Sequence, residues 1–236
     1  MLSPIEVLFE HPDFVVIDKP INICVQNESH QPGILPLLCQ QLNVEQLWLV
    51  HRLDKLTSGI LILAKHSKAA AVFGQLFEQR QIEKYYLAIS AKKPKKKQGA
   101  IKGGMKKVRD GKWMLDSSDN KVAISQFFSF FVSPGLRLFL VKPLTGKTHQ
   151  IRVALKSIGS PILGDDLYKG ANSDRTYLHA YCIRFVYQQQ TICIICPPNK
   201  GELFISGDTS QQIAKLTTPW SLEWPSVKLT QQKHAG

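Results

Sequence analysis

Residues 47–66 read LWLVHRLDKLTSGILILAKH, in which two apolar runs are joined by the short polar turn DKLTS. Apolar runs of this length on either side of a tight turn predict two paired β-strands in the interior of the protein. His51, Arg52 and Asp54 bring charge and polarity to the point where the first run meets the turn. A carboxylate held between two core strands must be paired or reactive, because an unpaired buried charge is costly. Asp54 is therefore a candidate for a chemical role.

Asp54 also has a simpler interpretation. Aspartate side chains often accept hydrogen bonds from nearby backbone N–H groups, and here the carboxylate would cap the turn through the backbone of Leu56 or Thr57. The local pattern alone favours this structural role over a catalytic one.

On both sides of this stretch the sequence predicts many strands and few helices. Apolar runs at 7–10 and 14–20 meet at a His-Pro-Asp turn, and runs at 121–132 and 136–144 meet at Ser-Pro-Gly, so both pairs predict hairpins. No regular alternation of strands with helices is present. The pattern predicts an α+β fold with a largely antiparallel mixed β-sheet and a few flanking helices, in a single catalytic-sized domain over residues 1–236. Further strands are expected at 83–90, 176–187 and 190–197, with helices from Ser67 as the cap to about Gln81, from Thr148 to Ile158, and after Gly207.

The segment LTGKTHQIR at 144–152 is a second candidate site, because a glycine-containing turn leads into a predicted helix. The N-terminus of a helix offers backbone N–H groups and a positive dipole to an anion such as phosphate. Lys147 and Arg152 would add full charges, and Thr148 and His149 lie on the same polar face. The alternative is an ordinary capped helix with a solvated polar face.

Positive charge is concentrated in one part of the chain. The 236 residues carry 30 Lys and Arg against 18 Asp and Glu, a net charge of +12, and the segment 92–112 holds ten basic residues and one acidic residue. We expect this segment to be a hairpin-like insertion that binds a polyanion, with nucleic acid as the first candidate. A solvated lysine-rich loop that only keeps the protein soluble is the alternative. The candidate contact residues are Lys95, Lys96, Lys97, Lys106 and Lys107.

Composition excludes several classes of protein. With 44% hydrophobic and 20% charged residues, the chain is not expected to be disordered, collagenous or a coiled coil. Acidic residues near the start argue against a signal peptide, and no apolar run is long enough to span a membrane, so we expect a soluble, cytoplasmic protein. Five scattered cysteines argue against a disulfide framework. Cys193 and Cys196 would point to opposite faces of a strand, which predicts buried cysteines and no metal site.

Three blocks of sequence resemble the RluA-type pseudouridine synthases. HRLDKLTSGILILAK is similar to the HRLD-x-x-TSG signature of that family, and Arg80-x-Ile82-x-Lys84-x-Tyr86-x-Ala88 is similar to its second block. PLTGKTHQIRV and GSPILGDDLY resemble the third block, while VVIDKP and YLHA also fit in order. The resemblance runs from about Val7 to Pro198. It implies the fold of that family, with a central active-site cleft, and an RNA-modifying isomerase.

The resemblance also implies roles for individual residues. Asp54 would be the catalytic carboxylate, Tyr86 would pack against the target uracil, and Arg152 would pair with Asp54. Arg52 would fill the place that the flipped base leaves in the RNA. Strand alternation puts Tyr85 and Tyr86 on opposite faces, and the family pattern selects Tyr86. No cofactor, nucleotide or metal is expected, since the reaction is an isomerisation without outside groups.

Three departures from the family pattern stand near the expected cleft. Lys147 replaces the usual Arg, Ala154 replaces a common His, and KPINI, with Asn22, replaces the usual KPxGL. We expect these changes to shift RNA affinity or choice and to leave the chemistry intact. The first block begins near Val7, so no separate N-terminal RNA-binding domain is expected, and a monomer is the default.

Two further hypotheses compete with a synthase that acts on a tRNA or rRNA stem-loop. The protein could be a non-catalytic RNA-binding or ribosome assembly factor that keeps the synthase fold, as the basic segment and the three departures suggest. An unrelated Asp-based nucleosidase or hydrolase is a third hypothesis, and it requires release of free uracil.

Overall fold

The computed structural model describes residues 4–27, 32–116 and 122–227. Its strands form one sheet, in the order β1-β2-β4-β10-β5-β9-β8-β6-β7, with β11 added to β10 and β3 to β4. The strands are β1 (Val7–Glu10), β2 (Phe14–Lys19), β3 (Trp48–Leu49), β4 (Ser58–Ala64), β5 (Glu83–Ser90), β6 (Gln98–Lys107), β7 (Trp113–Asp116), β8 (Val122–Ser133), β9 (Leu136–Pro143), β10 (Leu178–Tyr187) and β11 (Gln190–Ile195).

The pairing of these strands is antiparallel except between β4 and β10, where Ser58 and Gly59 pair in parallel with His179 and Ala180. The α-helices are α1 (Ile34–Leu42), α2 (Ser67–Glu78), α3 (Gln150–Ser157), α4 (Glu202–Ile205) and α5 (Gly207–Ala214), with 3-10 turns η1 (Asp166–Tyr168) and η2 (Pro219–Ser221). A largely antiparallel mixed sheet with few helices was expected, and this fold class is confirmed.

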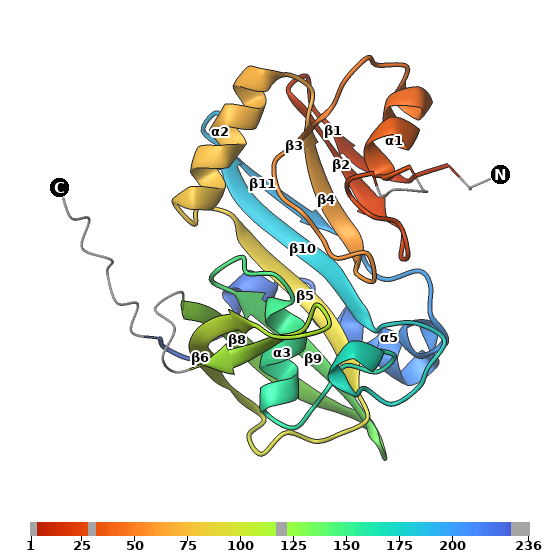
Figure 1. Ribbon diagram of the computed structural model, residues 1–236, viewed down its shortest axis with the longest axis vertical. Helices are drawn as coiled ribbons and strands as arrows, with labels where there is room; N and C mark the ends of the chain where they lie inside the picture. Colours follow the sequence, from red (N-terminus) through yellow and green to blue (C-terminus); the bar gives the residue numbers. More distant parts are fainter. Residues whose placement is uncertain (1–3, 28–31, 117–121, 228–236) are drawn as a thin grey trace.

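The described residues form two large buried apolar clusters and a small third one around Met105 and Tyr168. One large cluster joins α1 and α2 to β1, β2 and β4, and the other joins α3 and α5 to β5, β8 and β9. In Figure 1, β10 and β5 run along the length of the molecule between these two groups. Residues of β10 contribute to both clusters. Among the described residues, no helix is long and apolar enough to cross a membrane.

Several element boundaries differ from the expected ones. The run LWLVHRL forms a strand only at Trp48–Leu49, because the chain then leaves the sheet as a loop. The residue that caps α2 is His66, whose Nδ1 accepts a hydrogen bond from the Ala69 N–H at 3.1 Å, and not Ser67. Helix α3 begins at Gln150 because His149 adopts a left-handed conformation with φ of 56°. Helix α1 was not expected.

The basic segment is part of the sheet and not an excursion from it. Residues 98–104 of β6 pair with β8, and residues 104–107 pair with β7, whose residues 113–116 lie beyond the basic segment. Ile101 and Met105 point into the protein while Lys102 and Lys106 are exposed. The alternation typical of a half-buried strand was present in the sequence. The high density of lysine concealed it.

This arrangement divides the basic residues into two groups. Lys95, Lys96 and Lys97 precede β6, whereas Lys106 and Lys107 lie at its other end. A strand rises about 3.3 Å per residue, so the groups are separated by roughly 30 Å. The five lysines therefore do not form a single patch.

Gly59 allows the closest approach in the sheet. Its φ is 103°, and a Cβ atom there would lie 2.3 Å from the carbonyl oxygen of Ala180. We expect Gly59→Ala to lower the free energy of unfolding by about 3 kcal/mol or more, since both backbone strain and a clash with backbone atoms result.

Gly74 provides a matched control for this substitution, because it lies within α2 with nothing near its Cβ position. Gly74→Ala should raise stability by about 0.5–1 kcal/mol. Urea denaturation of both variants measures the difference. A Gly59→Ala variant as stable as the parent would contradict the close approach of β4 and β10.

Candidate active site

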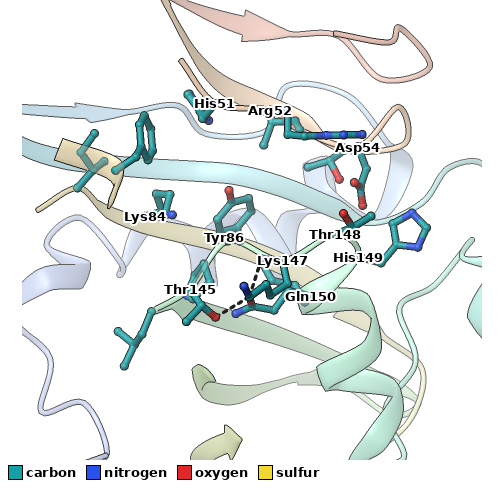
Figure 2. Close-up of a pocket in the computed structure, with 18 of the residues that line it drawn as sticks. His51, Arg52, Asp54, Lys84, Tyr86, Thr145, Lys147, Thr148, His149 and Gln150 are labelled. Atoms are coloured by element: carbon teal, nitrogen blue, oxygen red, sulfur yellow. Dashed lines mark hydrogen bonds between the residues drawn. The ribbon is translucent and has the colours of Figure 1, made fainter. Parts of the chain in front are cut away.

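A cavity of about 700 Å³ opens between the loop before β4, strand β5, the end of β9 and the start of α3. Figure 2 shows Asp54, Thr148 and His149 near one another at one end of it, Tyr86 in the middle and Lys84 toward the other end. Segments that are far apart in the sequence thus converge on one space. The three family-like blocks supply most of its lining.

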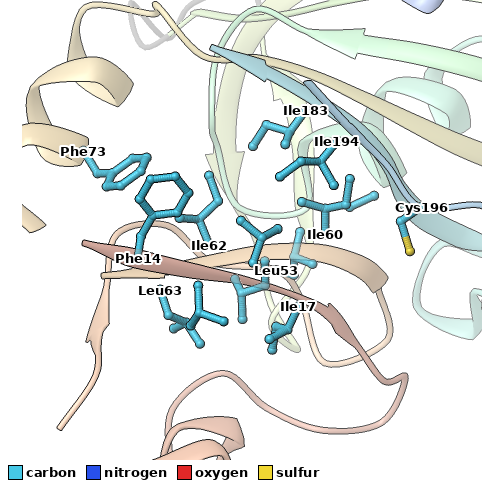
Figure 3. Packing of buried hydrophobic residues seen from close by; sticks show 14 of the residues in the cluster. Phe14, Ile17, Leu53, Ile60, Ile62, Leu63, Phe73, Ile183, Ile194 and Cys196 are labelled. Carbon is cyan, nitrogen blue, oxygen red and sulfur yellow. The ribbon is translucent and has the colours of Figure 1, made fainter. Parts of the chain in front are cut away.

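The loop that carries Asp54 is anchored to the core at Leu53. This side chain is 5% exposed and packs with Ile17, Ile60 and their neighbours (Figure 3). His51 supports the same loop, because its Nε2 accepts a hydrogen bond from the Ile62 N–H at 2.9 Å. Burial lowers the pKa of His51 to about 3, so the ring remains neutral as this contact requires. His51 therefore has a structural role.

Lys19 holds the Asp54 loop at Lys55, the residue that follows Asp54. Its buried ammonium donates to the carbonyl oxygens of Pro20 and Ile23 at 2.7 and 2.9 Å, and to that of Lys55 at 3.4 Å. The Asn22 N–H donates to the same Lys55 carbonyl at 2.9 Å. Asn22 has a φ of 67°, a left-handed conformation that asparagine tolerates better than most residues. The Asn in KPINI can therefore keep the turn that glycine makes in the family pattern.

The Asp54 carboxylate does not cap its own turn. The turn is closed by the Thr57 N–H, which donates to the backbone carbonyl of Asp54 at 3.0 Å. Among the described residues, the hydrogen-bond partner of the carboxylate is Arg152, whose Nη1 lies 3.5 Å from Oδ2. The side chain is 19% exposed and faces the cavity. The capping alternative is wrong at this position, and the carboxylate is accessible to a ligand.

Arg152 is buried and binds a second carboxylate more closely. Its Nε and Nη2 donate to the two oxygens of Asp165 at 2.7 and 2.8 Å, a bidentate pair. Burial opposes the charge on Arg152, but hydrogen bonds to Asp165 and the charges of Asp165 and Asp54 together raise its pKa. The polar face that the sequence placed on this helix thus turns inward at Arg152.

Tyr86 and Tyr85 point to opposite faces of β5, as strand alternation predicts. Tyr86 lines the cavity, whereas Tyr85 is fully buried in the other cluster. Burial and the nearby charge of Asp54 raise the pKa of Tyr86, so its hydroxyl stays protonated. Tyr86 can therefore offer an aromatic face and an O–H group to a ligand.

The turn before α3 is shaped by Gln150. Its side-chain oxygen accepts from the Lys147 N–H at 3.0 Å and from the Thr145 hydroxyl at 2.7 Å. One of the backbone donors expected for an anion is therefore used within the turn. Thr148 and His149 line the cavity, and the Lys147 and Arg52 side chains are exposed at its edge.

Sequence reasoning missed three residues of this site. Asp165 binds Arg152, Tyr168 packs beneath it, and Lys84 lines the cavity on the same face of β5 as Tyr86. Lys84 has no ion-pair partner within the described residues, and burial lowers its pKa. All three lie inside the family-like blocks. The spacing of two between Lys84 and Tyr86 was a usable signal for a shared face.

A second polar cluster lies behind the loop and does not form a metal site. Asp18, His179 and Cys196 bring possible ligand atoms within 4.8 Å of one another. The Nδ1 of His179 is 2.8 Å from the Ser58 hydroxyl, and its Nε2 is 2.7 Å from the Cys196 carbonyl oxygen. Both ring nitrogens are therefore occupied. Cys196 is buried as expected, but Cys193 is exposed on the opposite face of β11, which corrects that expectation.

Comparison with known proteins shows the family of the chain. Residues 13–157 match the sequence profile of the RNA pseudouridylate synthase family. A Haemophilus influenzae protein named as an uncharacterized RNA pseudouridine synthase is 50% identical over 220 residues, which cover 92% of this chain and 98% of that protein. The ribosomal large subunit pseudouridine synthase C of Rickettsia prowazekii is 33% identical, over 79% of this chain and 64% of that protein.

Solved structures give the same fold. Human RNA pseudouridylate synthase domain containing 1 superimposes with a TM-score of 0.72 at 21% identity, covering 91% of this chain and 96% of that one. The domain containing 4 protein gives 0.69 at 26% identity, covering 89% and 93%. The chain belongs to the RNA pseudouridylate synthase family, whose members are isomerases, and the RluA-type resemblance is confirmed.

His179 makes the stability of the folded site depend on pH. Burial lowers its pKa to about 4, whereas an exposed histidine titrates near 6.5. Between these values the unfolded chain binds a proton that the folded protein does not, so stability falls as pH decreases from about 6.5 to about 4. This group can contribute up to about 1.4 kcal/mol per pH unit. We expect His179→Gln to show a shallower loss in urea denaturation between pH 7 and 4, and an unchanged slope would contradict this role.

Proposed function

We propose that the protein isomerises a specific uridine to pseudouridine in a tRNA or rRNA stem-loop, with Asp54 as the catalytic carboxylate. The observation that supports this most strongly is a carboxylate left free by its own turn, beside a buried guanidinium, in a cavity with Tyr86. The family gives the reaction type. The substrate and the residue roles are the proposal.

The chemistry assigns each group a task. The bond from ribose C1′ to the uracil nitrogen must break, the base must turn, and a ring carbon must bond to the same ribose carbon. An ionised carboxylate near C1′ can act as nucleophile or base, and the Arg152 guanidinium lies 3.5 Å from the Asp54 carboxylate. Tyr86 can hold the detached uracil by ring packing while its hydroxyl reaches a proton or a water. No step needs a metal, a nucleotide or a redox cofactor.

The target base must leave its RNA stack to enter the cavity. Unstacking a base costs roughly a few kcal/mol, and contacts elsewhere have to offset it. Arg52 is exposed at the cavity edge, where its planar guanidinium can take the vacated place in the stack. Lys147, Thr148 and His149 also line the cavity and can bind the RNA. We further propose that the chain works as a cytoplasmic monomer.

Asp54→Asn tests the catalytic role, since it removes the charge and keeps the shape. We expect it to reduce pseudouridine formation on bulk uridine-containing RNA by about 10⁴-fold or more. Asp208→Asn makes the same chemical change on the exposed surface of α5 and should retain parental activity. Undiminished product with Asp54→Asn would refute the assignment, and release of free uracil would indicate a nucleosidase.

The RNA target can be found without prior assumption. Pseudouridine maps of total RNA from a deletion strain and its parent would differ at the modified site. Complementation with Asp54→Asn separates the proposed enzyme from an RNA-binding assembly factor. Full rescue of growth by that variant would favour the assembly factor, whereas failure to rescue supports a requirement for the modification.

The two lysine groups are expected to contribute differently to RNA binding. Strand β8, which pairs with β6, begins at Val122, a residue of the cavity wall that is opposite Gly104. Lys106 and Lys107 therefore lie near the cavity, and Lys95, Lys96 and Lys97 lie at the far end.

Changing Lys106 and Lys107 to Gln should weaken RNA binding and reduce its salt slope by about 0.7–0.9 for each phosphate that the variant no longer neutralises. The triple change of Lys95, Lys96 and Lys97 removes more charge and should have the smaller effect. Titrations at several salt concentrations measure both. A larger effect of the triple change would contradict this placement, and no effect of either would indicate solvated lysines only.

A further inference from the structure

His149 occupies an unusual position at the edge of the cavity. It immediately precedes α3, has a φ of 56°, and is half-buried. A left-handed conformation at a residue other than glycine costs about 1–3 kcal/mol, and persists only where surrounding contacts enforce it. The imidazole lies close to Asp54 in the cavity (Figure 2). The backbone therefore holds this ring at the reacting end of the site.

Tyr168 is the contact that fixes the ring. Its hydroxyl lies 2.9 Å from His149 Nδ1, and the two rings meet edge to face with centroids 5.7 Å apart. The tyrosine is 6% exposed, and its ring lies beneath the Arg152 guanidinium at 5.0 Å from the centroid. The same hydroxyl oxygen accepts a hydrogen bond from the Trp113 N–H of β7 at 3.0 Å.

The donors and acceptors around the Tyr168 hydroxyl indicate which nitrogen of His149 carries the proton. The Trp113 amide can only donate, so the Tyr168 oxygen is its acceptor. If His149 Nδ1 also donated to that oxygen, the buried Tyr168 hydrogen would have no acceptor among the described residues, which is costly. Tyr168 therefore donates to Nδ1. The proton of a neutral His149 must then lie on Nε2.

The surroundings favour the neutral form of His149. Burial lowers its pKa, the charges of Asp54 and Asp165 raise it, and those of Arg152 and Arg52 lower it. The balance is a pKa below the usual value for histidine. Near neutral pH the ring therefore offers the cavity one donor, Nε2–H, next to the carboxylate of Asp54.

We propose that His149 donates a hydrogen bond from Nε2 to an oxygen acceptor of the target nucleotide, and that Tyr168 is the positioning residue that fixes this tautomer. The proposal rests on the proposed function in one respect, namely that a nucleotide fills the cavity. A neutral donor suits a neutral carbonyl or hydroxyl oxygen, because it binds without placing a second cation beside Arg152.

The same contacts link the site to the basic strand. Trp113 pairs with Lys107 across β6 and β7, and its N–H is the donor that Tyr168 accepts. The chain of hydrogen bonds runs from the backbone of β7 through Tyr168 to His149. RNA held by Lys106 and Lys107 therefore contacts the same hairpin that orients the imidazole.

The tautomer can be tested in the free protein. Long-range proton–nitrogen correlation spectra of ¹⁵N-histidine-labelled protein distinguish a protonated Nε2 from a protonated Nδ1. We expect Nε2–H at His149 in the parent and a mixture of tautomers in Tyr168→Phe, which keeps the ring under Arg152 but loses the hydroxyl. Nδ1–H in the parent, or no change in Tyr168→Phe, would overturn the proposal whether or not any RNA is modified.

Activity tests the contact with the nucleotide. His149→Gln retains an N–H donor and His149→Met does not, while both impose a similar cost on the left-handed backbone. We expect kcat/KM to fall by about tenfold to a hundredfold in His149→Met and clearly less in His149→Gln. Equal losses in the two variants would overturn the proposed contact.

A double variant shows whether Tyr168 acts through His149. Tyr168→Phe should reduce kcat/KM in the parent but have little further effect in His149→Met, because residues in one chain of contacts are not additive. An undiminished effect in that background would overturn the positioning role. Absence of product from the parent protein would refute the proposed function itself, while the spectra would still decide the tautomer.

Discussion

The site depends on how one buried guanidinium divides its hydrogen bonds. Arg152 gives two short, parallel bonds to Asp165 and a single long contact of 3.5 Å to Asp54. Of the two carboxylates that contact this guanidinium, Asp165 is fully buried, and the less closely held Asp54 is the one exposed to the cavity. Asp165 thus satisfies and orients Arg152, so Arg152 makes only a long contact with Asp54 and does not bind it tightly. A carboxylate that is weakly held and open to the cavity is free to reach a ligand.

The position of Asp54 comes from long-range contacts around a loop that has little regular structure of its own. Lys19 from β2 holds the carbonyl of Lys55, and His51 is fixed by the backbone of β4. Ser58 is tied to His179 of β10, where Gly59 permits the close parallel pairing. These contacts use neutral groups or an ammonium fully satisfied by carbonyls, so none competes with Arg152 for the Asp54 carboxylate. The residues that hold the loop in place are thus different from the residue proposed to react, although they are neighbours in sequence.

The local sequence pattern predicted the features that depend on neighbouring residues alone. The hairpins β1–β2 and β8–β9 and the faces of Tyr85 and Tyr86 follow from apolar alternation and turn residues. The dense lysines of β6 mask its apolar alternation. The first expected strand of the Asp54 hairpin is reduced to β3, because the chain leaves the sheet before Asp54. The pairing of Arg152 with Asp165 and the link from β7 to Tyr168 join elements brought together by the fold. The resemblance to the family identified the sequence blocks that contain these residues. Which of their atoms are in contact is determined by the folded structure.

Exposed cations and neutral hydrogen-bond donors both line the cavity, and they suit different parts of a nucleotide. The exposed cations that line the cavity include Arg52, Arg80 and Lys147. Inside, Tyr86 and His149 are kept neutral by burial, so they offer an O–H and an N–H donor. Phosphates are charged and remain in solvent, where cations attract them at long range, whereas a uracil ring is neutral and must be desolvated. A second cation beside Arg152 would compete for the Asp54 carboxylate, so a neutral donor at His149 can bind the nucleotide and leave the Asp54–Arg152 contact in place.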